Sequence, residues 1–171
     1  MFLDEFGSNT MMARMFGYAP IGKRLYDAVP QGHRKSITCV AALTWDGLVA
    51  PWALDRAMNG EWCLSYVQQV LVPTLRPGQV VVMDNLPSHK VAGVAKAIEL
   101  AKARLIYLPP YSPDLNPIEK AFNQIKGKLR DLAARTVPAL FGAIVTAVKC
   151  VSPEACRNYF RSCGYGTATP S

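Results

Sequence analysis

The sequence lacks the patterns that identify several common classes of protein. It has five cysteines but no close CxxC pair, and an odd number of widely spaced cysteines argues against both a zinc site and a disulfide framework. No glycine-rich phosphate loop of either common pattern is present. A serine hydrolase is also disfavoured, because Ser88 and His89 are not part of a nucleophile elbow. The chemistry of this chain is therefore sought in other residue types.

Long hydrophobic runs are missing as well. The most apolar predicted helix, from Val137 to Val151, is shorter than the ~20 residues that span a bilayer, so we expect a core helix and no membrane partner. Because Met1 leads directly into a predicted strand, no signal peptide is expected. The cysteines are typical of buried thiols in a reducing compartment, which favours a cytoplasmic protein. They are Cys39, Cys63, Cys150, Cys156 and Cys163.

Length and composition favour one folded domain. The chain has 171 residues, of which 50% are hydrophobic, so we expect a substantial core and no general disorder. The sequence shows no internal repeat, low-complexity tract or interdomain linker. Its net charge of +7 favours a polyanionic partner such as nucleic acid or an anionic membrane, although a basic soluble protein without such a partner has the same charge.

Hydrophobic patterns and turn signals predict alternating strands and helices. Asp46-Gly47 is a strong hairpin signal, and Asn59 is a natural N-cap. We expect irregular structure at residues 7–35 and in the proline-rich stretch 109–116. The predicted strands are Met1–Glu5, Ser36–Leu43, Leu48–Leu54, Val80–Met83 and Arg104–Leu108. The predicted helices are Asn59–Leu71, Lys90–Ala101, Pro117–Ala134, Val137–Cys150 and Pro153–Cys163.

This order of elements predicts an α/β fold, in which a mixed sheet is flanked by helices. The apolar run Val80–Met83 is typical of a central strand that is buried on both faces. In such a topology the first strand can lie beside that strand, in the middle of the sheet. Asp4 and Asp84 would then be neighbours.

Three acidic residues are the main candidates for function. Asp4 and Asp84 end apolar, strand-like runs, and Glu119 lies in the first turn of a predicted helix. Strand ends and helix starts converge in α/β folds. Mg²⁺ prefers oxygen ligands, and two such ions ~3.5–4 Å apart can activate an attacking oxygen and stabilise a leaving one. Three converging carboxylates therefore predict a metal site that cuts phosphodiester bonds.

Each acid also has a simpler interpretation. Asp4 could be a turn residue that ends its strand, and Glu5, which points to the opposite face, is its rival for the site. Asp84 could be an Asx-turn residue. Glu119 could complete a capping box in which Asn116 is the N-cap. Only the occurrence of all three acids together favours the functional interpretation.

Other polar residues accompany these acids. His89 could contact a phosphate, orient a neighbouring side chain or simply begin the next helix. Basic residues flank the irregular insertion and follow Glu119 along its helix, where they would offset the charge of a phosphate backbone. A solvated helix face would show the same run of charge. No aromatic ladder for single strands is evident. The predicted DNA contacts are Lys23, Arg24, Arg34, Lys35, Lys120, Lys126 and Lys128.

Four blocks in a fixed order carry a family resemblance. They are FLDEFG at residues 2–7, GYAPIGKR at 17–24, VMDNLPSHK at 82–90 and LPPYSPDLNPIE at 108–119. Thirty-four residues, 85–118, separate Asp84 from Glu119. The pattern resembles the DDE transposases of the mariner superfamily, and most closely their bacterial insertion-sequence branch, over residues 1 to about 165.

The resemblance implies a single RNase H-like catalytic domain over residues 1–171, a Mg²⁺ or Mn²⁺ cofactor, and cut-and-paste transposition of DNA. It implies that Asp4, Asp84 and Glu119 are the metal ligands and catalytic residues. The implied supporting residues are Asn85, His89 and Asn116. The implied chemistry is cleavage at the element end by water, followed by attack of the freed 3′-hydroxyl on target DNA. The implied partners are double-stranded DNA at the element ends and target, and a second copy in an active homodimer, in the nucleoid of a bacterial cytoplasm.

One departure from the family pattern leaves alternatives open. Family members carry an N-terminal helix-turn-helix region, whereas here only three residues precede Asp4, so we expect its strand to be short and poorly supported. The chain could be the second reading frame of a split transposase with a helix-turn-helix partner, a truncated remnant or a mis-called start. A catalytically silent remnant that binds DNA or a full-length transposase is the alternative function. A host RNase H-like nuclease is the weaker one.

Overall fold

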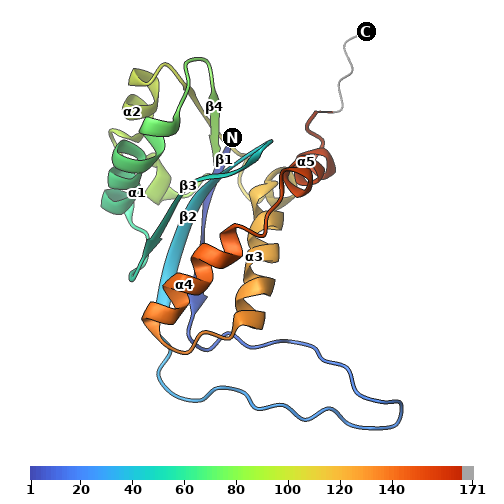
Figure 1. Ribbon diagram of the computed structural model, residues 1–171. Coiled ribbons are helices and arrows are strands. Elements are labelled where there is room, and N and C mark those ends of the chain that lie inside the picture. The colour runs from blue at the N-terminus through green and yellow to red at the C-terminus, as the bar shows by residue number, and fades with distance from the viewer. Residues whose placement is uncertain (167–171) are drawn as a thin grey trace.

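The computed structural model describes residues 1–166 and shows a five-stranded mixed sheet with helices on both faces (Figure 1). The strand order is β3-β2-β1-β4-β5, with β1 antiparallel to β2, β2 antiparallel to β3, and β4 parallel to both β1 and β5. As predicted, the first strand lies in the middle of the sheet beside the fourth. The strands are β1 (Phe2–Asn9), β2 (Ser36–Thr44), β3 (Gly47–Leu54), β4 (Val80–Met83) and β5 (Arg104–Tyr107).

The strand that carries Asp4 is longer and better supported than predicted. It runs for eight residues, and every one of them is paired with β2, from Phe2 opposite Leu43 to Asn9 opposite Ser36. Gly7, Ser8 and Asn9 have low strand propensity, so here the pairing partner decides the conformation. The Met1 ammonium group also donates a hydrogen bond of 2.8 Å to the Val80 carbonyl. The prediction of a short, poorly supported strand is therefore wrong.

Two helical layers cover the two faces of the sheet and bury two separate cores (Figure 1). Because side chains alternate along a strand, Phe2 and Phe6 of β1 enter one core and Leu3 enters the other. The first core packs against α3 (Ile118–Leu132), α4 (Val137–Val148) and α5 (Pro153–Ser162). The second packs against α1 (Gly60–Tyr66), its π-helical continuation Val67–Leu71 and α2 (Val94–Leu100).

The predicted core helix and thiols are found in these layers. Within residues 1–166 no single helix is long and apolar enough to cross a membrane, and only the pair α4 and α5, bent by 77°, passes on length and composition together. The buried face of α4 includes Leu140, Ile144 and Ala147. All five cysteines are free thiols, and all but the half-buried Cys150 are buried.

Two segments around the sheet differ from their predictions. The helix expected from Lys90 begins at Val94, because Gly93 has a left-handed φ of 102° and Pro87–Lys90 form a separate 3-10 turn. The proline-rich stretch, expected to be irregular, contains the 3-10 turn Pro113–Leu115. The long insertion has neither helix nor strand from residue 12 to residue 35, as predicted.

The start of α1 allows a test of the N-capping signal in the sequence. The Asn59 side chain accepts a hydrogen bond of 2.9 Å from the Trp62 N–H, as expected for an N-cap. We expect Asn59→Ala to lower the free energy of unfolding by about 1 kcal/mol, because that N–H loses its partner. Urea denaturation measures the change. Asn123→Ala, at an exposed position inside α3, is the control and should lose no stability; equal losses in both variants would contradict the capping role.

Candidate active site

The three predicted acids line one cleft of about 440 Å³. Leu3 of β1 pairs with Met83 of β4, so Asp4 and Asp84 hold the next position on two adjacent parallel strands. There β4 ends, whereas β1 continues. Glu119 is the second residue of α3 and reaches the cleft from the helical layer. The proline-rich segment, residues 108–113, also lines the cleft.

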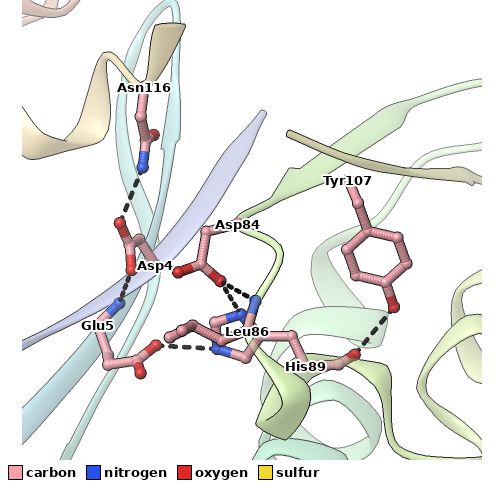
Figure 2. Close-up of polar contacts among 7 residues, drawn as sticks. All are labelled: Asp4, Glu5, Asp84, Leu86, His89, Tyr107 and Asn116. Carbon is pink, nitrogen blue, oxygen red and sulfur yellow. Dashed lines mark hydrogen bonds and ion pairs between the residues drawn. The ribbon is translucent and has the colours of Figure 1, made fainter. Parts of the chain in front are cut away.

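Asp4 is a buried carboxylate held by two hydrogen bonds. Its side chain is on the same face of β1 as Phe2 and Phe6, toward α3, and the residue is 6% exposed. Its oxygens accept one hydrogen bond of 2.8 Å from the Asn116 Nδ2 and one of 2.7 Å from the Glu5 N–H (Figure 2). Burial, opposed by that N–H and helped by the negative charges of nearby carboxylates, raises the pKa of Asp4 to about 7. A cation in the cleft would favour its ionised form.

Asp84 is held from the other side by His89. The His89 ring is buried between two carboxylates, with Nδ1 against Asp84 Oδ1 and Nε2 at 3.0 Å from Glu5 Oε2 (Figure 2). The same Asp84 oxygen accepts a 3.3 Å hydrogen bond from the Leu86 N–H. Asp84 is thus both a local turn residue and a cleft residue, and the two interpretations of the sequence are compatible.

Protonation of His89 is favoured by its two acidic partners. Burial alone disfavours the imidazolium, but the hydrogen bonds and negative charges of Asp84 and Glu5 outweigh it and raise the pKa of His89 to about 10. The Tyr107 hydroxyl donates a hydrogen bond of 2.9 Å to the His89 carbonyl, which fixes its backbone. His89 contacts Asp84 and Glu5, and it lies in the 3-10 turn rather than at the start of α2.

Glu5 and Tyr107 are the residues that the sequence did not single out for this role. From the sequence alone, Glu5 is only a rival to Asp4 for a place in the site. It does point to the opposite face of β1, as strand alternation requires, and it does not line the cleft. The sequence held a signal for it, because the segment with His89 precedes a helix that covers that same face. Nothing in the sequence pairs Tyr107 with His89.

The simple capping interpretation of Glu119 is wrong. The N-cap position of α3 is Pro117, and α3 has no side-chain capping hydrogen bond. The Asn116 side chain, which was expected to cap the helix, binds Asp4 instead. Glu119 is half-buried in the cleft wall. Because no capping hydrogen bond engages it, Glu119 is available to a ligand in the cleft.

The donor set of the cleft fits a hard divalent cation. It consists of carboxylate oxygens together with two buried amide oxygens, those of Asn85 and Asn116, which have no hydrogen-bond partner. Oxygen donors of this kind are what Mg²⁺ and Mn²⁺ prefer. Within residues 1–166, however, no three acidic, histidine or cysteine side chains already stand close enough to hold a cation. Asp4 and Asp84 are engaged by Asn116 and His89, so closing a metal site requires side-chain movement.

The predicted DNA contacts lie outside the cleft. Lys120 donates a hydrogen bond of 2.7 Å to Ser162, and the Lys126 ammonium lies 5.7 Å from the centre of the Phe6 ring. Lys128 is exposed on α3. The other four are exposed on the long insertion, which projects away from the sheet (Figure 1). They are Lys23, Arg24, Arg34 and Lys35.

Comparison with known proteins places this geometry in a family. The sequence model of the DDE superfamily endonucleases matches residues 1–140. The Tc1 transposase of Caenorhabditis elegans and the Tcb1 transposase of Caenorhabditis briggsae are each 26% identical to the chain over 119 residues, covering 58% of it and 44% of the relative. The chain therefore spans less than half the length of these curated relatives.

Solved structures show the same fold. A Mos1 transposase paired-end complex with the left transposon end has a TM-score of 0.73 and 17% identity, covering 95% of this chain and 51% of the other. The isolated catalytic domain of the Mos1 mariner transposase has a TM-score of 0.61 and 13% identity, with 95% and 76% covered. The predicted RNase H-like fold is confirmed by these likenesses. Because the family model matches most of the sequence, the chain belongs to the DDE superfamily endonuclease family.

Proposed function

We propose that this chain is the catalytic domain of a transposase that cleaves DNA and transfers the cut strand to a target. The observation that carries the proposal is the convergence of Asp4, Asp84 and Glu119 on one cleft, from two adjacent parallel strands and a helix start. The curated relatives of the chain are transposases by name. We further propose, from the sequence blocks alone, that it belongs to the bacterial insertion-sequence branch and acts in the nucleoid.

Asp4, Asp84 and Glu119 would hold Mg²⁺ or Mn²⁺, and Mos1 paired-end complexes have been solved with Mg and with Mn. When bound, such a cation would polarise the phosphodiester, activate the attacking oxygen and stabilise the leaving oxygen. The residues of the chain position this site. Asn116 orients Asp4, and His89 orients Asp84. The proline-rich wall restricts the cleft, so that a phosphodiester enters in a limited range of orientations.

The proposed partners are double-stranded DNA at the element ends and target, and a second copy of the chain. The net charge of +7 and the exposed basic residues of the insertion and of α3 support contact with phosphates. Mos1 has been solved in paired-end complexes with transposon DNA. An upstream helix-turn-helix partner remains part of the proposal, since the chain covers about half of these proteins.

A plasmid assay tests the proposed function without knowledge of the element ends. We expect the chain to nick supercoiled plasmid in Mn²⁺ or Mg²⁺, to stop when EDTA removes the metal, and to join a 3′-hydroxyl oligonucleotide to the plasmid. A folded chain that does neither would contradict the proposal. Cleavage of RNA–DNA hybrids without joining of DNA strands would favour a host nuclease instead.

The absence of a preformed three-ligand cluster within residues 1–166 favours the silent remnant as a second candidate. That candidate predicts that calorimetry detects no binding of Mn²⁺ to the folded chain. Binding of Mn²⁺ would exclude it, because a decayed site with fixed side chains has no reason to retain affinity for a hard cation.

A further inference from the structure

We propose that Glu5 is a positioning residue of this site, which orients His89 so that His89 fixes the carboxylate of Asp84. The inference rests on the proposed function, because it concerns a residue that serves a metal-binding carboxylate. Glu5 itself does not line the cleft. Its role would be to set the position of a ligand that lies one side chain away.

Glu5, His89 and Asp84 form a chain of three contacting side chains, which we call the Glu5–His89–Asp84 relay (Figure 2). Glu5 Oε2 lies 3.0 Å from His89 Nε2, and His89 Nδ1 contacts Asp84 Oδ1. The His89 side chain is 3% exposed, whereas those of Glu5 and Asp84 are 20% and 29% exposed. Carboxylates only accept hydrogen bonds, so both ring nitrogens of His89 act as donors. Every polar atom of this buried ring therefore has a partner.

Glu5 decides which edge of the ring faces Asp84. An imidazole with one acceptor can turn about its Cβ–Cγ bond and leave the other N–H buried without a partner, which is energetically unfavourable. An acceptor at each edge removes that freedom. Asp84 needs this support, because it is partly exposed and, among residues 1–166, its only other hydrogen bond is a long one from the Leu86 N–H.

Because Glu5 is adjacent to Asp4, the relay also links the positions of two acids of the site. Successive strand residues point to opposite faces, so Asp4 enters the cleft directly while Glu5 reaches His89 on the other face. One dipeptide on β1 thus supports both the acid on its own strand and the acid at the end of β4. A shift of β1 would therefore act on Asp4 directly and on Asp84 through Glu5 and His89.

The alternative is that Glu5 only satisfies a buried histidine and contributes to stability. The two roles differ in what they change. A purely structural Glu5 affects the free energy of unfolding but not the affinity of the folded site for metal. A positioning Glu5 affects that affinity, because residues that orient metal ligands typically contribute about 10–100-fold to it.

Two variants of matched shape test the inference. Glu5→Met keeps the length of the side chain but removes the acceptor, whereas Glu5→Gln keeps an oxygen acceptor and removes the charge. Glu99→Gln, at an exposed position on α2, is the control for loss of one negative charge. Calorimetry with MnCl₂ measures affinity, thermal unfolding checks that each variant is folded, and ¹⁵N NMR of the metal-free chain follows the His89 ring N–H groups.

We expect Glu5→Met to weaken Mn²⁺ binding by about 10-fold and to abolish the protected Nε2–H signal. Glu5→Gln should retain most of the affinity and the signal, and Glu99→Gln should match the wild type. Wild-type affinity in folded Glu5→Met, or an unchanged Nε2–H signal, would overturn the role of Glu5 alone. A wild-type chain that binds no Mn²⁺ and nicks no DNA would instead overturn the proposed function, and the role of Glu5 with it.

Discussion

Replacing Asp84 by asparagine is expected to reduce plasmid nicking by about 1000-fold or more. The substitution keeps the size of the side chain and its place at the end of β4 but removes the negative charge that a divalent cation requires. Charge stabilisation by a bound metal contributes several kcal/mol to the transition state, and each ~1.4 kcal/mol is a factor of ten in rate.

The measurement compares initial nicking rates in Mn²⁺ at equal concentrations of folded protein. Asp55→Asn is the control, because Asp55 is an exposed aspartate that does not line the cleft, and this variant should nick at the wild-type rate. Thermal unfolding verifies that Asp84→Asn is folded at the assay temperature. Nicking by this variant within about threefold of the wild type would show that Asp84 is not a catalytic residue.

The second large effect concerns the helix that brings Glu119 to the sheet. Phe122 of α3 is fully buried, and its ring centre lies 4.6 Å from that of Phe6 on β1. We expect Phe122→Ala to lower the free energy of unfolding by about 3–5 kcal/mol, because it leaves a cavity between helix and sheet. That is a large fraction of the stability of a typical domain.

Denaturation in guanidinium chloride measures this loss. The control is Phe16→Ala, since Phe16 is 87% exposed on the long insertion and should change stability by no more than about 0.5 kcal/mol. A loss below about 1 kcal/mol for Phe122→Ala would mean that α3 is not anchored through this contact. The nicking rate should fall in proportion to the folded fraction, because Glu119 and Asn116 are in place only when α3 is packed on the sheet.

The elements that could be predicted from the sequence are those whose signal is local. Asp46-Gly47 predicted the hairpin of β2 and β3, which turns through Trp45 and Asp46 between the paired residues Thr44 and Gly47. The Val80–Met83 run predicted β4 with its bounds unchanged, and β4 lies inside the sheet between β1 and β5, but only one of its faces is fully buried because half-buried and buried residues alternate along it. The central place of the first strand followed from the order of the elements. The sequence alone therefore predicts that Asp4 and Asp84 are neighbours.

The remaining features depend on partners that are distant in sequence. Gly7 to Asn9 extend β1 because β2 supplies their hydrogen bonds. Asn116 has every local feature of an N-cap, but its Nδ2 donates to the buried Asp4 carboxylate, and its Oδ1 accepts no hydrogen bond from the first turn of α3. Glu5 binds His89 across 84 positions. In each case a hydrogen bond between residues distant in sequence, which no local pattern encodes, determines the conformation.

The pairing of β1 with its two neighbours is unequal, and this has a consequence for the order of folding. β1 pairs with β2 at eight positions but with β4 at only two, Phe2 with Val82 and Leu3 with Met83. The second junction also closes a loop of about 80 residues, since Met1 and Val80 are 79 positions apart, and long loops close late. We expect β1, β2 and β3 to assemble first and the junction with β4 to form last. The cleft would then be the final part of the domain to form and the first to open on unfolding, so an ion shared by Asp4 and Asp84 should slow unfolding more than it speeds folding.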